Sequence, residues 1–487
     1  MSDGLLKLGP LYIKIGQILS CREKLLPPEW VTALERLQDR VPAKSGEDAL
    51  ELARSAFGSK EFMDDVLESF DDVPIAAASL GQVHLGVLKP NVTSVDSMPN
   101  SKNVKVAIKI QRARLRDIYD KDLALMKKIA KMGDKFSMDV GGAKQSWSDI
   151  FQDTEKILYR EIDYQTEARN AIQFALDFGI GYDGTSITPT NPELPSASSW
   201  LRTPYIYENL SNEKILVQEY VPSIKINDFD ALKNVNVTQP DRDFLAECLA
   251  RSYLRQFCSN QFFSTDPHPG NLGVEVIKET GRPRLVFYDF GQACSLQKDQ
   301  AEGILSVIEG IMDLDAPGCV QAFDQMGVLV KGADLDIVTR KVQQNFDTGK
   351  VKVKKRKSMN EGETYDLTTE SNGMVSEIES SENQKKPLAQ NAETVQDKDV
   401  MPYFTLPAEY AFVARALSQM DGVGKSLDPE FDFISASAPY IVEVKGVKTF
   451  VVDKVAKLEA EWIEKLGLDP EKIKGIKNVI QKRSFDE

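Results

Sequence analysis

Histidine is rare in this chain of 487 residues, which contains only His84 and His268. A metal site built on several histidines and a Ser-His-Asp triad are therefore not expected. The five cysteines are scattered and never form a Cys-x-x-Cys pair, so we expect reduced thiols and no zinc site. No run of about 18 apolar residues occurs, and the sequence therefore predicts no transmembrane helix.

Positive charge is also in deficit, because 60 Lys and Arg residues stand against 74 Asp and Glu, for a net charge of −14. This balance argues against a general nucleic-acid binder, which is normally basic, and no nucleic-acid partner is expected. It also disfavours nonspecific attraction to an anionic membrane, although a local basic patch can still provide it. The first residues, Met-Ser-Asp-Gly-Leu-Leu, have neither a secretory nor a transit signature, which leaves the compartment open.

The chain does contain a distinctive polar turn, which runs from Asp266 to Asn271. Its two prolines and one glycine prevent a helix there. A short apolar strand over residues 285–288 leads into Asp289, and Gly291 loosens the backbone just after it. We expect Asp266, Asn271 and Asp289 to converge at one end of a small sheet. Hard oxygen ligands suit Mg²⁺, so Asn271 and Asp289 are the predicted ligands of Mg²⁺ or Mn²⁺.

The order of these polar residues matches the protein-kinase signature, in which an Asp is followed five residues later by an Asn and then by Asp-Phe-Gly. Asp266, Asn271 and Asp289-Phe290-Gly291 fit this order, which makes Asp266 the predicted catalytic residue. The His-Arg pair that should precede the Asp is replaced by Ser264-Thr265. An Asp-Phe-Gly by itself is often a strand end followed by a turn, but the upstream Asp and Asn favour the catalytic interpretation.

Two segments in the first quarter of the chain fit a phosphate site. Residues 76–87 have the pattern of a strand, a tight turn and a strand. The small side chains of Ala76-Ala77-Ala78-Ser79 let the N–H groups of such a turn approach a phosphate, although an ordinary glycine-containing hairpin explains the same pattern. Residues 104–111 alternate between polar and apolar residues, which predicts a strand that carries Lys109.

A predicted helical region over residues 148–178 carries the acidic residues Glu161, Asp163 and Glu167. Asp163 and Glu167 lie four apart on one helical face, where like charges repel unless cations neutralise them. A solvated acidic stripe is the alternative interpretation.

Two other segments carry candidate site residues. Residues 214–220 form an apolar strand that leads into a point where the chain would cross to a second lobe, so Glu219 and Val221 are candidates for nucleotide binding. In a predicted helix near the N-terminus, Lys14 and Gln17 lie three apart and share one face. From this segment alone, a solvated polar edge is the favoured interpretation of that pair.

These pieces occur in one chain order: phosphate-loop hairpin, strand lysine, helix glutamate, hinge strand, Asp–Asn turn and Asp-Phe-Gly. Together they describe a two-lobed nucleotide clamp. Lys109 would hold the α- and β-phosphates, and a helix carboxylate would orient Lys109. Phosphoryl transfer needs mainly positioning and charge neutralisation, which Lys109 and a metal ion at Asn271 and Asp289 would supply.

At this level of detail the chain resembles the UbiB-type (aarF-domain) atypical kinases. The resemblance runs from about residue 8 to 345 and resumes at about 406–431. The segments that carry it are Lys14-Ile15-Gly16-Gln17, Ala76-Ala77-Ala78-Ser79, Val106-Ala107-Ile108-Lys109, Glu161-Ile162-Asp163 with Glu167, and Asp266 with Asn271 and Asp289.

The resemblance implies an α+β, two-lobed protein-kinase-like fold, with an N-terminal helical extension that covers the active site and extra C-terminal helices. The implied division is a helical extension over residues 1–45, a small lobe over 46–222, a large lobe over 223–349, a disordered acidic and polar insertion over 350–400, and C-terminal helices over 401–487. Within this fold the resemblance implies that Glu167 pairs with Lys109.

The same family relationship implies how ordinary kinase activity is restrained. The extension that carries Lys14 and Gln17 would cover the place where protein kinases bind peptides, with Lys14 paired to Glu161 and Asp163. This overturns the interpretation of both segments as solvated surface. The alanine-rich loop stands where protein kinases have a glycine-rich loop and restrains ordinary kinase activity in the family.

Members of the family bind ATP or ADP with a divalent cation and support isoprenoid-quinone and prenyl-lipid metabolism. The resemblance therefore implies a nucleotide partner, a lipid or quinone-precursor substrate and peripheral contact with a membrane. A plastid is the expected location, with the mitochondrion as the alternative. A nucleotide-dependent scaffold of a biosynthetic complex is the alternative function, and protein phosphorylation is a third.

Overall fold

The computed structural model describes residues 11–12, 43–77, 80–93, 104–135, 147–360, 395–405 and 408–446. The chain divides into two compact units, the first formed by Met1–Ser295 with Phe412–Glu487 and the second by Leu296–Ala411. The boundary after Ser295 falls inside the range 223–349 that was predicted as a large lobe. Lys109, Glu167, Asp266, Asn271 and Asp289 all belong to the first unit.

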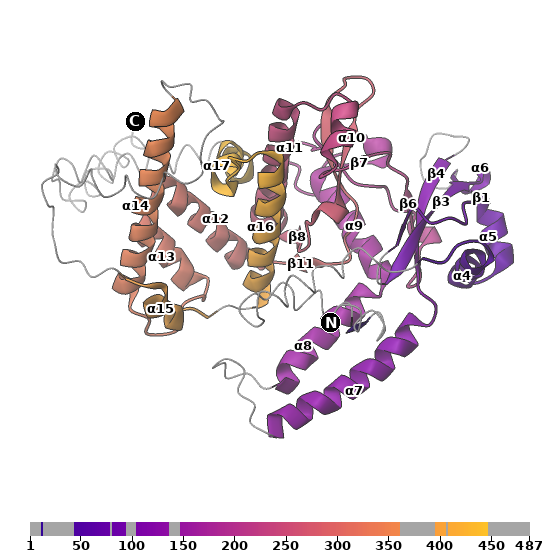
Figure 1. Cartoon of the computed structure of the whole chain (residues 1–487), viewed down its shortest axis with the longest axis horizontal. Helices are drawn as coiled ribbons and strands as arrows, with labels where there is room; N and C mark the ends of the chain where they lie inside the picture. The colour runs from indigo at the N-terminus through magenta and orange to yellow at the C-terminus, as the bar shows by residue number, and fades with distance from the viewer. Residues whose placement is uncertain are drawn as a thin grey trace, which may run out of the picture. The chain divides into compact units, whose positions relative to one another are not determined.

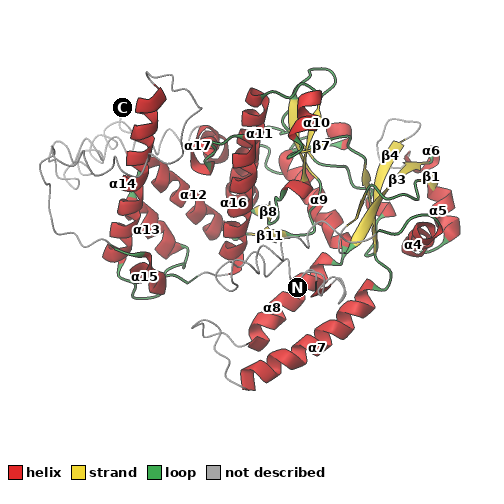
Figure 2. Ribbon diagram, in the orientation of Figure 1, coloured by secondary structure: helices red, strands yellow, loops and turns green. Residues whose placement is uncertain are grey.

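An antiparallel sheet forms the N-terminal part of the first unit (Figures 1 and 2). Its strands are β1 (Leu67–Phe70), β2 (Ala76–Ala77), β3 (Gly81–Leu88), β4 (Val104–Gln111) and β6 (Ile215–Glu219), in the order β1-β3-β4-β6 with β2 paired to β3. A short helix, α6 (Pro90–Thr93), follows β3.

One face of this sheet is covered by helices α4 (Glu47–Phe57) and α5 (Lys60–Val66). Val106, Ile108 and Ile110 alternate along β4 and pack into the core that these helices share with the sheet. Because successive side chains of a strand point to opposite faces, Lys109 faces the other side of the sheet. The predicted strand that carries Lys109 is thus confirmed over Val104–Gln111.

Two helices, α7 (Leu115–Lys135) and α8 (Trp147–Glu161), follow β4 and form a hairpin beside the sheet (Figure 1). Their shared core contains Tyr119 of α7 and Leu158 and Ile162 at the end of α8. Leu11, from a short helical piece near the N-terminus, is fully buried in the same core.

The helical region predicted over 148–178 is broken between α8 and α9 (Tyr164–Phe178). Asp163 has an extended backbone, and its side chain accepts a hydrogen bond from the Gln165 N–H at 3.0 Å. An aspartate in this position caps the start of a helix, so the chain turns here instead of continuing one long helix.

A second sheet lies in the C-terminal part of the first unit, with strands in the order β5 (Leu201–Arg202), β10 (Pro283–Phe287), β9 (Leu272–Val276) and β7 (Ile224–Lys225). Beyond it, β8 (Phe262–Ser264) pairs with β11 (Ala293–Ser295). The helices of this part are α10 (Phe229–Asn234), α11 (Gln239–Arg255), α16 (Ala408–Leu427), α17 (Phe433–Ser437) and α18 (Ile441–Lys445). The strand ends carry the predicted Asp–Asn turn and Asp289.

The described elements of the second unit are mainly helical: α12 (Lys298–Asp313), α13 (Ala316–Gln325), α14 (Leu335–Asn360) and α15 (Asp397–Val400), with the start of α16. Helix α14 covers residues 350–360 of the range 350–400 that was predicted as a disordered insertion, and residues 361–394 lie outside the described residues. The range 401–487, predicted as C-terminal helices, lies outside them beyond residue 446. Short 3₁₀ or π turns occur at Tyr182–Gly184, Glu208–Leu210, Gln256–Asn260, Pro269–Asn271, Met401–Tyr403 and Ala438–Tyr440.

Candidate active site

Lys109 lies between two carboxylates that come from distant parts of the chain. Its Nζ donates to Glu167 Oε1 at 2.7 Å and Oε2 at 2.8 Å, and to Asp289 Oδ2 at 2.9 Å. The Glu167 side chain is 4% exposed and that of Lys109 is 19% exposed. The predicted ion pair between Lys109 and Glu167 is therefore confirmed, and the same lysine also contacts the aspartate of Asp-Phe-Gly.

Helix α9 brings Glu167 to this place because its apolar face packs on the Asp-Phe-Gly segment. The Phe174 ring lies 4.7 Å from the Phe290 ring and 5.2 Å from the Phe287 ring, measured between centroids. The Asn170 amide donates to the Phe290 carbonyl at 2.8 Å. Aromatic packing and this hydrogen bond together fix α9 against the segment that positions Asp289.

The charge of this cluster is unbalanced, since one lysine faces two carboxylates. Burial raises the pKa of Glu167 to about 7, and repulsion from Asp289 acts in the same direction against the attraction of Lys109. Burial by itself would lower the pKa of Lys109, but Asp289 and Glu167 outweigh it and hold that pKa well above its ordinary value. Lys109 is thus held as a cation, while Glu167 titrates near neutral pH.

Tyr164 closes the cluster on the side of strand β3. Its ring centroid lies 5.1 Å from Lys109 Nζ, within the range of a cation–π contact. Its hydroxyl is so close to Gly81 that a Cβ at that position would overlap it. The absence of a side chain at Gly81 therefore makes room for Tyr164 beneath the lysine.

The turn that contains Asp266 and Asn271 lies next to Asp289. The Asn271 Nδ2 donates to the Asp266 carbonyl at 3.0 Å, and the Tyr288 N–H donates to the Asn271 carbonyl at 3.1 Å. Leu272 pairs with Phe287 in the sheet, so Asn271 and Asp289 extend from neighbouring strand ends. Pro269 sets the short 3₁₀ turn in which Asn271 lies.

The donor atoms at Asn271 and Asp289 fit the predicted metal ion. Within the described ranges no group of three or more His, Cys, Asp or Glu side chains is arranged to hold a metal by itself. A carboxylate and an amide oxygen provide only part of an octahedral shell, and Mg²⁺ commonly completes such a shell with phosphate oxygens and water. These residues therefore suit a metal ion that arrives with a nucleotide.

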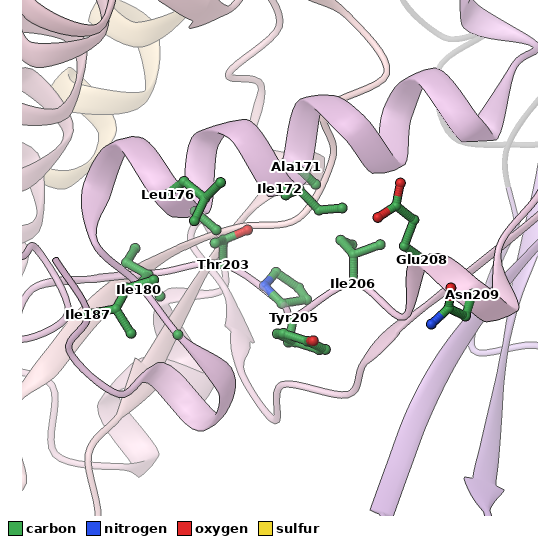
Figure 3. Close-up of a pocket in the computed structure, with 13 residues that line it drawn as sticks. Ala171, Ile172, Leu176, Ile180, Ile187, Thr203, Tyr205, Ile206, Glu208 and Asn209 are labelled. Carbon is green, nitrogen blue, oxygen red and sulfur yellow. The ribbon is translucent and has the colours of Figure 1, made fainter. Parts of the chain in front are cut away.

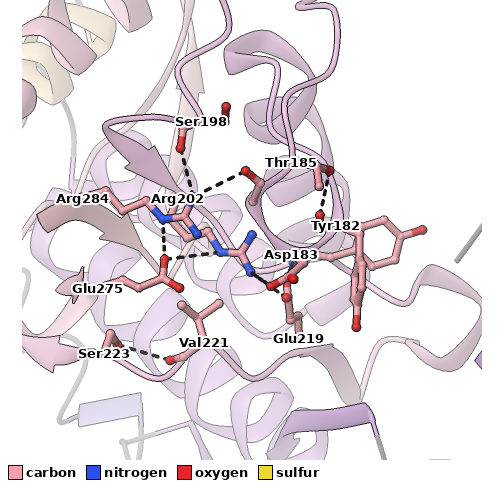
Figure 4. A network of polar contacts seen from close by, with 12 residues as sticks. Tyr182, Asp183, Thr185, Ser198, Arg202, Glu219, Val221, Ser223, Glu275 and Arg284 are labelled. Carbon is pink, nitrogen blue, oxygen red and sulfur yellow. Dashed lines mark hydrogen bonds and ion pairs between the residues drawn. The ribbon is translucent and has the colours of Figure 1, made fainter. Parts of the chain in front are cut away.

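The side chain of Glu219 is engaged in a buried polar network (Figure 4). Its Oε1 accepts from Arg202 Nη2 at 2.6 Å, and its Oε2 accepts from the Tyr205 N–H at 3.1 Å. Arg202 is 2% exposed and also lies 3.8 Å from Glu275, so it joins β6 to the second sheet. Val221 is buried just beyond β6, at 5% exposure. A nucleotide at this hinge would therefore meet the backbone of Glu219 and not its carboxylate.

The other predicted site residues are only partly described. Lys14, Gln17, Ala78 and Ser79 lie outside the described residues. Ala76 and Ala77 form β2, opposite Val83 and Gln82 of β3.

The acidic residues predicted to meet Lys14 lie near the start of α9. Glu161 is buried at 6% exposure, and Asp163 caps α9 while lying 3.7 Å from Arg169. Asp163 thus has a local structural role that its spacing from Glu167 did not indicate.

Two arginines in the site were missed by the sequence analysis. Arg202 holds Glu219, and Arg415 of α16 lies 3.3 Å from Asp266 through its Nη2 and Oδ1 atoms. Neither belongs to a local motif, and both reach their partners only through tertiary structure. A single sequence carries no signal that could have found them.

A separate cavity of about 280 Å³ lies beside α9, between that helix and the segment that precedes β6 (Figure 3). Its lining is mainly aliphatic, with Ile172 and Leu176 on the helix and Ile206 opposite them. None of the residues of the Lys109 cluster lines it.

The Lys–Glu–Asp cluster beneath a five-stranded sheet and the Asp–Asn turn beside it define a protein-kinase-like nucleotide site. Residues 36–323 match the family model described as the ABC1 atypical kinase-like domain. The chain therefore belongs to the ABC1/UbiB family of atypical kinases, and the resemblance found in the sequence is confirmed. A kinase-like domain of this kind implies that the protein binds a nucleotide.

Individual relatives agree with this assignment. The chain is 34% identical over 463 residues to the chloroplastic protein Activity of BC1 complex kinase 8 of Arabidopsis thaliana, an alignment that covers 95% of this chain and 56% of that protein. It is 31% identical over 295 residues to the probable protein kinase UbiB of Pseudomonas putida, covering 61% of this chain and 48% of that protein. The chain thus spans about half the length of these relatives.

The structure of Rv3197 with erythromycin from Mycobacterium tuberculosis is similar in fold, with a TM-score of 0.50 and 19% sequence identity. The match covers 87% of this chain and 90% of that chain. The predicted α+β kinase-like fold is confirmed at this level. Among the described helices, none combines the length and the apolar character that crossing a bilayer requires.

Proposed function

We propose that this protein is an atypical kinase or ATPase that binds ATP or ADP with Mg²⁺ and acts in isoprenoid-quinone or prenyl-lipid metabolism. The observation that carries the proposal is the position of Lys109, within 2.9 Å of both Glu167 and Asp289 and on the face of the sheet opposite α4 and α5. The second carboxylate, that of Asp289, is 34% exposed. A purely structural ion pair between Lys109 and Glu167 would not need it.

Each residue of the cluster has a proposed role. Lys109 binds the α- and β-phosphates, and Glu167 orients it. Asp266 accepts the proton of the attacking hydroxyl or water, because it is the only carboxylate of the Asp–Asn turn. A metal ion bound at Asn271 and Asp289 would neutralise charge on the transferred phosphoryl group. The hinge at Glu219 and Val221 binds the base through its backbone.

We further propose that the N-terminal extension covers the site, with Lys14 near Glu161 and Asp163. Leu11 supports this arrangement, because it is fully buried in a core that includes Ile162, and Lys14 follows it closely in the sequence. A peptide hydroxyl would then be kept from Asp266, whereas a small substrate delivered from a membrane could reach it. The alanine-rich loop at 76–79 restrains protein phosphorylation further.

The face of α7 supports contact with a lipid surface. Leu125, Ile129 and Met132 are 51%, 59% and 56% exposed and recur at helical spacing. Lys121 and Lys128 are also exposed on this helix. Exposed apolar side chains flanked by lysines are typical of helices that lie on anionic membranes, even when the whole protein is acidic.

The proposed location is a plastid, since the relative from Arabidopsis thaliana is named chloroplastic. The mitochondrion is the alternative. The proposed division of the chain is the one expected above, with the extension over 1–45, the lobes over 46–222 and 223–349, the insertion over 350–400 and the C-terminal helices over 401–487.

A nucleotide turnover assay tests the proposed function. Phosphate release from Mg-ATP is measured with no lipid, with anionic vesicles, and with vesicles that contain a phenolic quinone precursor. The expected result is turnover that rises with vesicles and falls strongly in Asp266→Asn to a residual rate, while this variant should still show a nucleotide-induced rise in melting temperature.

Two results would favour other functions. Nucleotide binding without turnover under every condition, with Asp266→Asn indistinguishable from wild type, would favour the scaffold. Rapid radiolabel transfer to a generic protein substrate would favour a protein kinase and contradict the proposed cover.

A further inference from the structure

Arg415 of α16 contacts both segments that carry the proposed catalytic and metal-binding aspartates. Its Nη2 lies 3.3 Å from Asp266 Oδ1, and its Nη1 donates to Gln292 Oε1 at 3.0 Å. Gln292 directly follows Asp289-Phe290-Gly291 in the sequence. The Arg415 and Asp266 side chains are 23% and 16% exposed, so water only partly screens their interaction.

The two segments are also joined through their backbones at this point. The Thr265 N–H donates to the Gln292 carbonyl at 3.0 Å, and Ser264 pairs with Ala293 in the β8–β11 ladder. Arg415 adds a side-chain bridge over this ladder. Contacts therefore run from Arg415 to Gln292, from Gln292 to Thr265, and from Asp266, the neighbour of Thr265, back to Arg415. The position of the guanidinium thus depends on both segments.

We propose that Arg415 is a positioning residue that holds the Asp266 carboxylate in the direction required for phosphoryl transfer; this inference rests on the proposed function. Asp266 follows a three-residue strand and lies in a turn, so its carboxylate has few neighbours from its own element. The ion pair with Arg415 holds this carboxylate from outside its own turn, and the hydrogen bond of the guanidinium to Gln292 Oε1 in turn fixes the planar group in direction. Phosphoryl transfer depends mainly on positioning, and a displacement of about 1 Å can cost about 100-fold in rate.

A lysine would not reproduce this arrangement. Arg415 uses two different nitrogens for Asp266 and Gln292, whereas an ammonium group is a single point charge. Helix α16 comes from a segment that follows Asp266 by about 140 residues. The C-terminal part of the chain thus contributes directly to the geometry of the site.

The test compares Arg415→Gln and Arg415→Lys with wild type in nucleotide turnover. Because Arg415 contacts Asp266 and not Lys109, we expect kcat to fall about 10- to 100-fold in Arg415→Gln while KM for nucleotide and the nucleotide-induced melting shift stay the same. Arg415→Lys should recover part of the loss. In an Asp266→Asn background, Arg415→Gln should have no further effect on kcat, because the two residues act as one unit.

Arg251 provides a matched control. Its side chain is 20% exposed and pairs with Glu443 at 2.7 Å, so like Arg415 it is partly exposed and forms an ion pair between the C-terminal helices and an earlier part of the chain. Arg251→Gln should lower the melting temperature without changing kcat. An equal loss of kcat in Arg251→Gln and Arg415→Gln, or a change in KM that accounts for the whole loss in Arg415→Gln, would overturn the proposal.

Failure of the proposed function can be separated from failure of this inference. If wild type turns over no nucleotide, the proposed function is wrong, and a double-mutant cycle on melting temperature decides the Arg415 assignment. Shifts of Arg415→Gln and Asp266→Asn that do not add in the double variant would support the interaction. Shifts that add would overturn it.

Discussion

Lys109 and Asp289 are 180 positions apart in the sequence, and the Nζ of the lysine lies 2.9 Å from the Oδ2 of the aspartate. Glu167, carried by α9, contacts the same Nζ at 2.7 Å. The small sheet, the helix and the Asp-Phe-Gly segment are thus held together at one ammonium group. Removal of the Lys109 ammonium group should therefore weaken both folding and nucleotide binding.

Lys109→Met is expected to lower the free energy of unfolding by about 3–5 kcal/mol, because it leaves the buried Glu167 without its cation. The change is measured by urea denaturation, together with the melting shift that Mg-ADP induces. The nucleotide shift should be lost. Lys109→Met combined with Glu167→Met should recover part of the stability but none of the nucleotide shift, whereas a loss below about 1 kcal/mol in the single variant would contradict the prediction.

The titration of Glu167 should appear in the pH dependence of stability. Its pKa in the folded protein is about 7, above its ordinary value of 4.5, so the folded state binds this proton more tightly. Glu167 therefore contributes stability that is fully present below about pH 4.5 and is lost as the pH rises through about 7.

Glu167→Gln removes this titration, which makes it the comparison for the pH experiment. The free energy of unfolding of wild type minus that of Glu167→Gln should fall as the pH is raised from 5 to 8, in the absence of nucleotide and metal, by ~1.4 kcal/mol per pH unit at most. Calorimetry at closely spaced pH values measures it. A difference that is flat, or that rises with pH, would show that Glu167 is already ionised at pH 5.

The polar network at the hinge should contribute mainly to stability. Glu219→Gln leaves the buried Arg202 with Glu275 at 3.8 Å and the exposed Asp183 at 3.7 Å as its remaining carboxylates. We expect a loss of about 3 kcal/mol in the free energy of unfolding, because breaking a buried ion pair leaves a charge uncompensated. Chemical denaturation is the measurement.

Glu208→Gln is the control for Glu219→Gln, since Glu208 is exposed and lies close by in the sequence. Its effect should stay within about 0.5 kcal/mol. If Glu219 bound nucleotide through its carboxylate, Glu219→Gln would abolish the nucleotide-induced melting shift. With a backbone contact the shift should survive.

Local motifs explain why much of the site could be predicted from the sequence. The turn between Asp266 and Asn271 is set by its own prolines and glycine, and alternation in 104–111 places Lys109 opposite the core-facing residues. Both features depend on backbone preferences within a few residues. The chain order of kinase motifs then implied a helix carboxylate as the partner of Lys109, and the family resemblance identified it as Glu167.

Other features depend on contacts that no local pattern records. Arg415 and Arg202 reach Asp266 and Glu219 through tertiary packing. The helical period continues across Asp163, so the region 148–178 looked like one helix, although the capping side chain starts a new one there. In both cases the interaction that determines the structure is made by a polar side chain, and the pattern of apolar residues in the sequence does not record it.

The exposed face of α7 should determine binding to membranes. A variant with serine at positions 125, 129 and 132 removes the apolar groups of Leu125, Ile129 and Met132 while keeping the lysines. We expect its affinity for vesicles of phosphatidylcholine and phosphatidylglycerol to fall at least tenfold, since each buried CH₂ contributes about 0.8 kcal/mol. Co-sedimentation measures the binding.

Val73 and Ile75 provide a control, because they are 59% and 52% exposed but lie on a loop beside β2. Their replacement by serine should leave vesicle binding unchanged. Equal losses in both variants would mean that general surface hydrophobicity, and not α7, governs binding. Unchanged binding of the α7 variant would exclude this helix as the membrane contact.

The last prediction concerns Gly81, which determines how closely Tyr164 approaches the sheet beneath Lys109. A methyl group at Gly81 would overlap the Tyr164 hydroxyl and lie 2.5 Å from the Ile110 carbonyl, which is part of the neighbouring strand and cannot move alone. Gly81→Ala should therefore displace Tyr164 and cost about 1–3 kcal/mol in the free energy of unfolding. Because the Tyr164 ring lies 5.1 Å from Lys109 Nζ, the affinity for Mg-ADP should also fall.

Gly86 on the same strand tests whether the effect is specific to Tyr164. A methyl group there would lie 2.8 Å from Cδ1 of Ile108, the far end of a side chain that can rotate, and 3.2 Å from the Ser69 carbonyl. Gly86→Ala should cost less stability and leave the affinity for Mg-ADP unchanged, because Ile108 points into the core, away from Lys109. Denaturation and nucleotide titration of the two variants separate these effects. Equal stability losses with unchanged affinity in both would show that Tyr164 does not position the lysine.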